Sequence, residues 1–247
     1  MNLFRRFLAE TRTATYSFLR RRTAVFFTFL FPLLIIVIFG VLVQTDSAGG
    51  LLARPAGYYV PGYLAVVILF TPLSRIGSTV ARYRDGNRFE KLATTPLRKS
   101  EWLAAQTFVN TLIILIASIL LLGALLLLTN ANIIFTPLLL IFIASGVILF
   151  CGIGAILGFL ADSQDGVIAA SNAIALPLLF LSDTFIPPSM LPSWFRPVIL
   201  ISPLTYFSRG IRALTYYNEP AIGDMLILIG LAVVFFVLGS ISIPVTD

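Results

Sequence analysis

The feature that most constrains this chain is a set of long stretches that contain no charged residue. They cover residues 23–45, 55–74, 102–161, 166–182 and 225–246. A helix needs about 20 mainly apolar residues to cross the hydrocarbon core of a bilayer. The stretch 102–161 is long enough for two helices, and Asn130, Asn132 and Pro137 mark a turn inside it.

We therefore expect an all-α integral membrane protein with six transmembrane helices. The expected helices lie at residues 23–44, 58–80, 104–128, 134–161, 166–182 and 224–244. The composition agrees, because only 11% of the residues are charged, whereas a typical soluble domain has about 25%. A soluble globular domain is therefore excluded.

The basic residues predict how the helices are oriented, because cytoplasmic loops of membrane proteins carry an excess of Lys and Arg. Twelve of the 17 basic residues fall in two segments, one before the first expected helix and one between the second and third. Both segments lie on the same side of a six-helix layout. We therefore expect both termini to be cytoplasmic.

Residues 1–22 show a second pattern besides their basic charge. Apolar residues recur at helical spacing with arginines between them: Leu3, Phe4, Phe7, Leu8, Phe18 and Leu19. This pattern is typical of an amphipathic helix that lies in the membrane interface. The alternative is a basic anchor that only sets the topology.

The loop at residues 81–102 is the longest polar stretch, with six basic and three acidic residues. Phe89 and Leu92 are three positions apart, so a short helix that ends before Pro96 would place both on one side. The loop is either a solvated segment that holds the topology or a docking element with apolar residues inside a charged rim. Composition alone favours the first interpretation.

Residues 183–217 are too rich in proline for a simple spanning helix. The prolines are Pro187, Pro188, Pro192, Pro197 and Pro203, and aromatic residues lie among them. Aromatic side chains suit the headgroup level of a bilayer. We expect two short extracellular half-helices before the last span, which enter the outer leaflet and return while buried against protein.

The chain lacks the residues that several kinds of chemistry require. It has no histidine and a single cysteine, Cys151, which excludes histidine-ligated zinc sites, Ser-His-Asp hydrolysis and an internal disulfide. It also lacks a phosphate-binding loop of the G-x-x-x-x-G-K-[ST] type. We therefore expect this chain to be no enzyme on its own and to hold no cofactor.

Two features inside the expected helices have open alternatives. Gly154 and Gly158 form a G-x-x-x-G face for close helix packing, either within the subunit or between subunits. Arg75 lies near the cytoplasmic end of the second expected helix. An ionisable residue there is a functional hypothesis by default, and the alternative is a guanidinium that extends to the inner interface.

Asp162, Asp165 and Gly166 form a D-x-x-D-G string like the one that begins the metal motif of CDP-alcohol phosphatidyltransferases. That motif continues with two aspartates four residues apart, and no later aspartates have this spacing. We therefore interpret the string as a polar turn in which Asp165 caps the fifth helix.

Four segments carry a likeness to known proteins. They are RRRTAVFFTFLFPLLIIVIFG, YYVPGYLAVVI, RDGNRFEKLATTPLRKSEW and FLSDTFIPPSMLPSWFRPVILISPLTYFSRGIRAL. In this order they resemble the membrane subunit of ABC transporters of the type-2 permease family, the drug, lipid and polysaccharide exporters. The whole chain, residues 1–247, would then be one permease domain.

The resemblance implies roles for two sets of residues. The ATPase-coupling set, in segment 82–97, comprises Arg84, Asp85, Arg88, Phe89, Glu90, Leu92, Thr95 and Pro96. The set in the extracellular half-helices comprises Leu191, Pro192, Trp194, Pro203, Tyr206 and Arg212. One departure is that the family's G-T is Asn87-Arg88 here, which makes the coupling segment more basic.

The resemblance also implies partners and a mechanism. The permease would lie in the plasma membrane of a prokaryote and pair with a second copy, or with a close relative, among membrane lipids. Two copies of a cytoplasmic ATPase, which hold ATP and Mg²⁺, would bind the coupling segments and residues 1–22. An apolar or amphipathic substrate would leave between the first, second and fifth helices of the pair. The resemblance thus favours the docking interpretation of loop 81–102. Nucleic acid is not an expected partner.

Two alternatives belong to other classes. An ATPase-independent channel or secondary carrier would lack an obvious ion relay, because the expected helices contain almost no charge. An integral membrane enzyme would need a catalytic set that the chain does not contain. The residues do not distinguish drugs, lipids and lipid-linked glycans as substrates.

Overall fold

The computed structural model describes residues 3–38, 55–129, 131–185, 194 and 196–243. Over these residues it contains helices and no strand, which confirms the all-α class. The elements are α1 (Leu3–Leu19), α2 (Arg22–Ile36), η2 (Ala56–Tyr59), α3 (Val60–Asp85), α4 (Arg88–Ala93), α5 (Lys99–Leu128), α6 (Leu138–Leu160), α7 (Gln164–Phe180), α8 (Arg196–Ile199), α9 (Pro203–Arg212), η5 (Ala213–Tyr217) and α10 (Ile222–Ser242).

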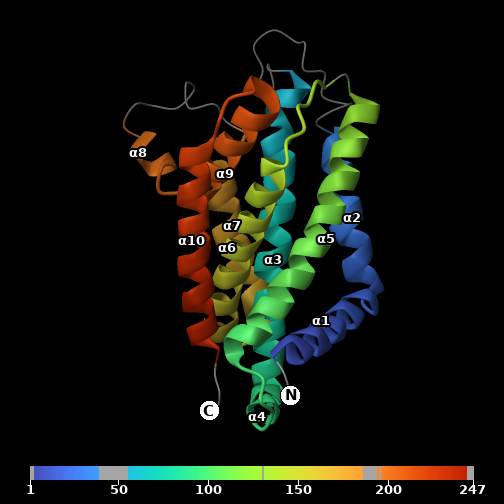
Figure 1. Ribbon diagram of the computed structural model, residues 1–247, viewed down its shortest axis with the longest axis vertical. Helices are drawn as coiled ribbons and strands as arrows, with labels where there is room; N and C mark the ends of the chain where they lie inside the picture. The colour runs from blue at the N-terminus through green and yellow to red at the C-terminus, as the bar shows by residue number, and fades with distance from the viewer. Residues whose placement is uncertain (1–2, 39–54, 130, 186–193, 195, 244–247) are drawn as a thin grey trace.

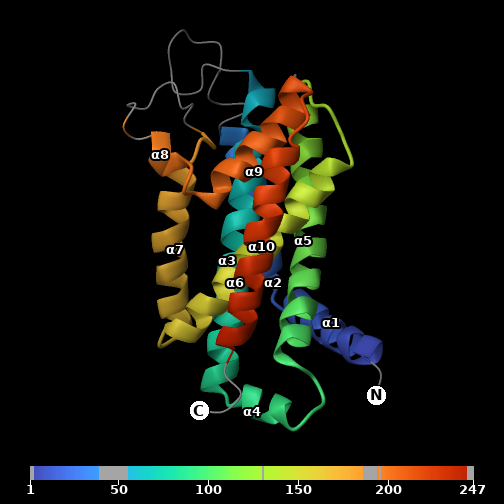
Figure 2. The same cartoon turned by 60° about the vertical axis from the view of Figure 1, so that its left-hand side comes forward.

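The long helices stand side by side as a bundle, and α1 lies across one end of it (Figure 1). The short helix α4 projects from the same end, where α10 also finishes (Figure 2). The helices α8 and α9 and the turn η5 lie towards the opposite end. The fold therefore has an α1–α4 end and an α8–α9 end, and these names are used below.

Four helical segments are long and apolar enough to cross a membrane: Ala56–Asp85, Lys99–Leu128, Leu138–Leu160 and Ile222–Ser242. The expected helices 58–80, 104–128, 134–161 and 224–244 are thus present, with ends shifted by a few residues. The expected helix 23–44 is helical through α2, and its last residues lie outside the described part of the chain. The expected helix 166–182 is α7, which has 17 residues. Length and composition therefore establish a multi-pass membrane protein with four clear spans.

Helix α3 occupies the centre of the bundle, and it packs against α5, α6, α7 and α9. Its residues from Val60 to Leu69 are fully or almost fully buried. Two large aromatic side chains of α6 and α9, Phe142 and Phe207, are also fully buried and belong to the same core. The core is therefore built around one helix that neighbours surround.

Small residues allow the helices next to α3 to approach it closely. A Cβ atom at Gly154 would lie 2.6 Å from the carbonyl oxygen of Leu73, and one at Gly158 would meet the carbonyl oxygen of Gly77. Real Cβ atoms are not found this close to a backbone oxygen. The G-x-x-x-G face thus packs against α3 of the same chain, as close helix contacts in membranes require.

Large apolar side chains cover the outside of the bundle. Leu127 on α5 and Leu226, Val233 and Ile241 on α10 are all more than half exposed. An extended apolar surface of this kind is costly in water and is normal in contact with acyl chains. The outward faces of α5 and α10 therefore fit a lipid environment.

Candidate functional site

The corner between α3 and α5 positions the segment that was predicted to couple to an ATPase. Helix α3 ends at Asp85, and the chain reverses at Asn87, whose φ of 50° is left-handed. Asparagine tolerates this conformation better than most residues. Helix α4 follows and ends at Ala93, where the hydroxyls of Thr94 and Thr95 donate to the carbonyls of Lys91 and Leu92.

An aromatic cluster anchors α4 to the bundle. The Phe89 ring lies 5.5 Å from the ring of Tyr83 and 5.3 Å from the ring of Trp102, measured between centroids. Phe89 is buried, and Leu92 also packs against the core. The two residues therefore share one side of α4, as expected, but that side faces the bundle. Phe89 thus anchors α4 to the bundle, and its role in ATPase coupling stays a prediction.

The outward side of α4 is charged and polar. Glu90 and Lys91 are exposed there, and Thr94, Thr95 and Pro96 continue the exposed surface after the helix. Helix α4 and the segment after it form the tip of the α1–α4 end (Figure 2). A partner that binds this tip would meet a rigidly held charged surface.

Two arginines of the predicted coupling set make contacts within the chain. Arg84 donates to the carbonyl oxygens of Phe159 at 2.7 Å and Ala161 at 2.6 Å, and it pairs with Asp85 at 3.4 Å. The carbonyls at a helix C-terminus lack intrahelical partners and attract positive charge. Arg84 therefore caps α6 and ties it to α3, and Arg88 lies over the ring of Tyr83.

Helix α1 is joined to the same corner by buried polar contacts. Arg6 pairs with Glu101 at 3.3 Å and also donates to the carbonyl oxygen of Pro96. Glu10 accepts a hydrogen bond from Gln106 at 2.9 Å. Burial raises the pKa of the Glu10 carboxyl, and the Gln106 hydrogen bond opposes this rise. Helix α1 is thus fixed to α5 and to the segment after α4.

The α8–α9 end is organised around a buried ion pair. Arg212, at the end of α9, pairs with Asp183 at 3.3 Å, and both side chains are almost completely buried. The same guanidinium donates to the carbonyl oxygens of Asp183 at 2.8 Å and Thr184 at 3.3 Å. It also lies 4.4 Å from the centre of the Tyr58 ring. Arg212 therefore joins α9 to the segment after α7 and to η2, which precedes α3.

The carboxyl of Asp183 responds to this environment. Burial raises its pKa from the usual 3.8 to about 6, and the positive charges of Arg212 and Arg209 limit the rise. Next to it, the hydroxyls of Thr184 and Ser208 are hydrogen-bonded at 2.7 Å. A polar network thus holds α9 against the end of α7.

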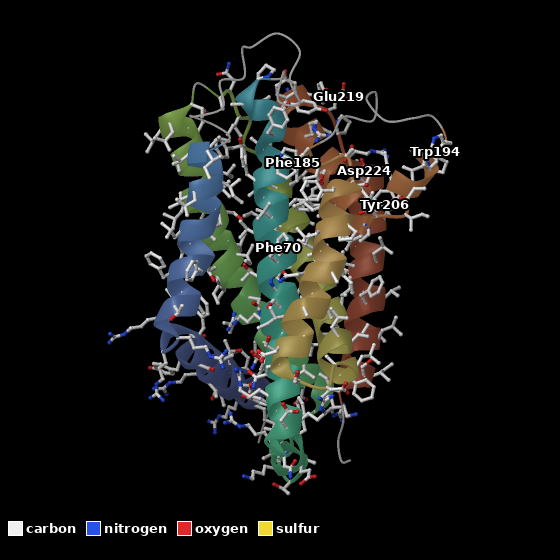
Figure 3. All side chains as sticks on the ribbon, turned by 180° about the vertical axis from the view of Figure 1, so that it is seen from behind. Phe70, Phe185, Trp194, Tyr206, Glu219 and Asp224 are labelled. Carbon is white, nitrogen blue, oxygen red and sulfur yellow. The ribbon has the colours of Figure 1, made fainter. Side chains whose placement is uncertain are left out.

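The other residues of the half-helix set have different positions. Pro203 occupies the first position of α9, where its missing N–H costs nothing. The Tyr206 hydroxyl donates to the carbonyl of Leu200 at 2.8 Å, and Trp194 is exposed at the outer rim (Figure 3). Leu191 and Pro192 lie outside the described residues. Two short helices, α8 and α9, are therefore present before α10.

Two further candidates are placed by the structure. Ser163 rather than Asp165 caps α7, because its side chain accepts a hydrogen bond from the Gly166 N–H at 3.0 Å. The expected cap at Asp165 is therefore wrong. Asp165 instead lies in the first turn, where a negative charge favours the helix dipole. Arg75 lies inside the bundle and donates to Asn110 of α5 at 3.0 Å.

A family model described as the ABC-2 type transporter matches residues 5–216, which cover most of α1, all of α2 to α9 and the α4 corner. The chain belongs to the ABC-2 type transporter family. This permease is therefore a membrane transport subunit that is not catalytic by itself. A search of curated proteins finds no match to it.

Sequence reasoning missed several residues that hold the permease together. Glu101 follows Arg98 by three residues, and its side chain accepts from the Arg98 N–H, a spacing that predicts a helix start. Asn110 and Gln106 are uncharged, so a search for charge-free stretches passes over them. Their partners Arg75 and Glu10 lie on other helices, and no local pattern connects them.

Proposed function

We propose that the permease is the membrane-spanning subunit of an ATP-driven exporter and that α4 is its coupling element. The observation that carries this proposal is the geometry of α4. Its inner side is locked to Tyr83 and Trp102, and its outer side presents Glu90 and Lys91 at the tip of the molecule. A rigid attachment is what force transmission from a separate motor subunit needs.

The connections of α4 support a path for that force into the membrane. A push on α4 would act on α3 through the aromatic cluster and on α6 through Arg84. It would act on α1 through the contacts that Arg6 makes with Pro96 and Glu101. Closure of two ATPase subunits could then move α1, α3 and α6 together.

We further propose that α2 and α7 complete a six-span layout, with the α1–α4 end in the cytoplasm of a prokaryote. The basic residues of that end support this orientation. Two copies of the chain, or this chain and a close relative, would then place α2, α3 and α7 along a shared export path. ATP and Mg²⁺ would be held by the two ATPase subunits.

Reconstitution of the purified permease into proteoliposomes, with and without a candidate ATPase subunit, tests this function. We expect the permease to form a stable complex with the ATPase, to raise its ATP hydrolysis rate, and to export an amphipathic substrate only when ATP is present. Transport at the same rate in vesicles that contain the permease alone would instead support the ATPase-independent channel or carrier.

A further inference from the structure

A cavity of about 400 Å³ lies where α1 and α2 meet α3 and α7. Its lining combines two chemistries. Phe18, Phe27 and Phe70 supply aromatic surface, and Arg21 and Arg75 supply two positive charges. Hydroxyl and amide side chains of α2, α3 and α7 fill the spaces between them, and none of the described lining residues is acidic. Figure 3 marks Phe70 on α3, part-way along the bundle.

Neutral groups hold the Arg75 side chain in this cavity. One guanidinium nitrogen donates to Asn110 at 3.0 Å, and the guanidinium carbon lies 4.7 Å from the centre of the Phe18 ring. Asn110 is itself oriented by a hydrogen bond to the carbonyl of Gln106 at 2.9 Å. A guanidinium has five N–H donors, so most of those on Arg75 remain available to a ligand.

No carboxylate among the described residues lies within ion-pair distance of Arg75 or Arg21. This distinguishes Arg75 from Arg212, which also lies inside the bundle but has Asp183 as its counter-charge. A positive charge inside a membrane segment is costly unless an opposite charge approaches it. The missing counter-charge indicates that the ligand of this cavity is an anion.

The positions of the lining residues along α3 indicate where the headgroup and the apolar chain of the ligand would lie. Arg75 precedes the end of α3 at Asp85 by ten residues, which corresponds to about 15 Å along the helix. Phe70 lies another five residues away from that end, about 7.5 Å deeper into the bundle. Arg75 therefore lies nearer the membrane surface than Phe70, which is the order of headgroup and chain in one leaflet.

From this arrangement we propose that the cavity binds an amphiphile with a phosphate headgroup. The phosphate oxygens accept hydrogen bonds from Arg75 and Arg21, as guanidinium groups bind phosphate with two parallel donors. The apolar chain lies along Phe27 and Phe70. The identification of this ligand as the exported substrate rests on the proposed function, because α2, α3 and α7 form the proposed export path.

Binding to the detergent-purified full chain tests this site without any ATPase. The probes are phosphatidic acid and phosphatidylcholine with identical acyl chains, titrated by native mass spectrometry. We expect the unmodified chain to bind phosphatidic acid more tightly. Arg75→Gln and Arg21→Gln should each weaken that binding by about tenfold or more, the loss expected for a charge-assisted hydrogen bond.

Three further variants make the result decisive. Arg5→Gln removes an exposed charge of α1 outside the cavity lining and should leave binding unchanged. Arg75→Lys keeps the positive charge and should bind more tightly than Arg75→Gln. Arg21 is exposed, so its variant reports on binding even if Arg75→Gln misfolds. A double variant of Arg21 and Arg75 should bind both lipids equally.

Two results would overturn the proposal. One is unchanged preference for phosphatidic acid in both the Arg21 and Arg75 variants. The other is displacement of phosphatidic acid by inorganic phosphate at the same concentration as the lipid, which would assign the cavity to a free anion. Since the assay contains no ATPase, a failure of ATPase coupling with intact lipid binding would count against the proposed function alone.

Discussion

Charged residues serve opposite purposes at the two ends of the permease. Glu90 and Lys91 are exposed on α4, and exposed charges contribute little to stability on their own. Arg212 and Asp183 are buried as a pair, and removal of one member of such a pair leaves an uncompensated charge. The exposed charges are therefore free to contact a partner, whereas the buried pair affects the stability of the fold.

The Glu90→Arg substitution tests the exposed surface. We expect it to abolish the stimulation of ATP hydrolysis in the reconstituted complex and to leave the thermal unfolding temperature unchanged, because Glu90 contacts solvent. The matched control is Glu219→Arg, an exposed acid at the α8–α9 end (Figure 3). Normal stimulation in the Glu90 variant, or an equal loss in the Glu219 variant, would contradict the role of α4.

The Asp183 carboxyl predicts a pH dependence of stability. Its native pKa of about 6 exceeds the usual 3.8, so the native state keeps a proton that the unfolded chain releases. The stabilisation from this group is therefore complete below about pH 4 and is lost as the pH rises to about 6, by about 3 kcal/mol. Above that pH it should not change further.

Thermal unfolding of the purified permease between pH 4 and 7 measures this effect. We expect Asp183→Asn to flatten the decline, since the amide does not ionise and can still accept from Arg212. Asp85→Asn, which changes an exposed carboxyl, should keep the decline. A flat profile in the unmodified protein would show that the buried carboxyl does not titrate in this range.

At the scale of helices, glycine positions set how closely α3 and α6 approach. Gly154 and Gly158 face backbone atoms of α3, so any Cβ atom there must displace the main chain of a neighbour. Gly123 in α5 and Gly230 in α10 have open space around their Cα atoms. The chain therefore contains matched glycines inside and outside a helix interface.

We expect Gly154→Ala to lower the unfolding temperature and the yield of folded protein. Overpacking of a tight interface costs about 1–3 kcal/mol. Gly123→Ala should leave stability the same or raise it slightly, because alanine favours helix and meets no neighbour. Equal stability of the two variants would mean that α6 can shift away from α3 without cost.

At the scale of the whole molecule, the cavity and the outward face of α10 lie on different sides of the bundle. The cavity opens among α2, α3 and α7, whereas α10 carries exposed apolar side chains such as Val233. A second copy that shared the export path would have to approach on the α2–α7 side. We therefore expect the α2–α7 side to contact a second copy and α10 to contact lipid.

Cysteine cross-linking in native membranes tests that arrangement. Cys151 is fully buried, so a single introduced cysteine gives the accessible thiol. Asn172→Cys on α7 should form a covalent dimer on oxidation, and Val233→Cys on α10 should remain monomeric. The reverse pattern would place the second copy against α10 and remove the shared export path.

Four of the six predicted spans are present as helices long enough to cross a membrane, and the predictions were less accurate at the helix ends. A search for charge-free stretches started the third helix at residue 104, but α5 begins at Lys99. It ended the second helix at residue 80, but α3 continues to Asp85. Helices extend beyond the hydrocarbon core into water, where charged residues are tolerated, so charge marks the membrane boundary rather than the helix boundary.

The coupling segment shows the limit of local patterns. The spacing of Phe89 and Leu92 correctly put both on one side of a short helix. Whether that side faces a partner or the bundle depends on Tyr83 and Trp102, which supply the rings that cover Phe89. Those rings come from two other helices, and a short segment contains no information about them.

The sequence by itself determined the helical class, the membrane environment, the family and the segregation of basic charge. The family follows from the four motifs that carry the resemblance. The other properties follow from local composition, because the solvent around each segment depends on how many charges it carries. Tertiary structure alone decided the cap that Arg84 places on a helix 77 residues away and the contact of Arg75 with Asn110. It also decided that Arg75 has no acidic partner among the described residues, since a counter-charge from a distant segment is present or absent only once helices pack.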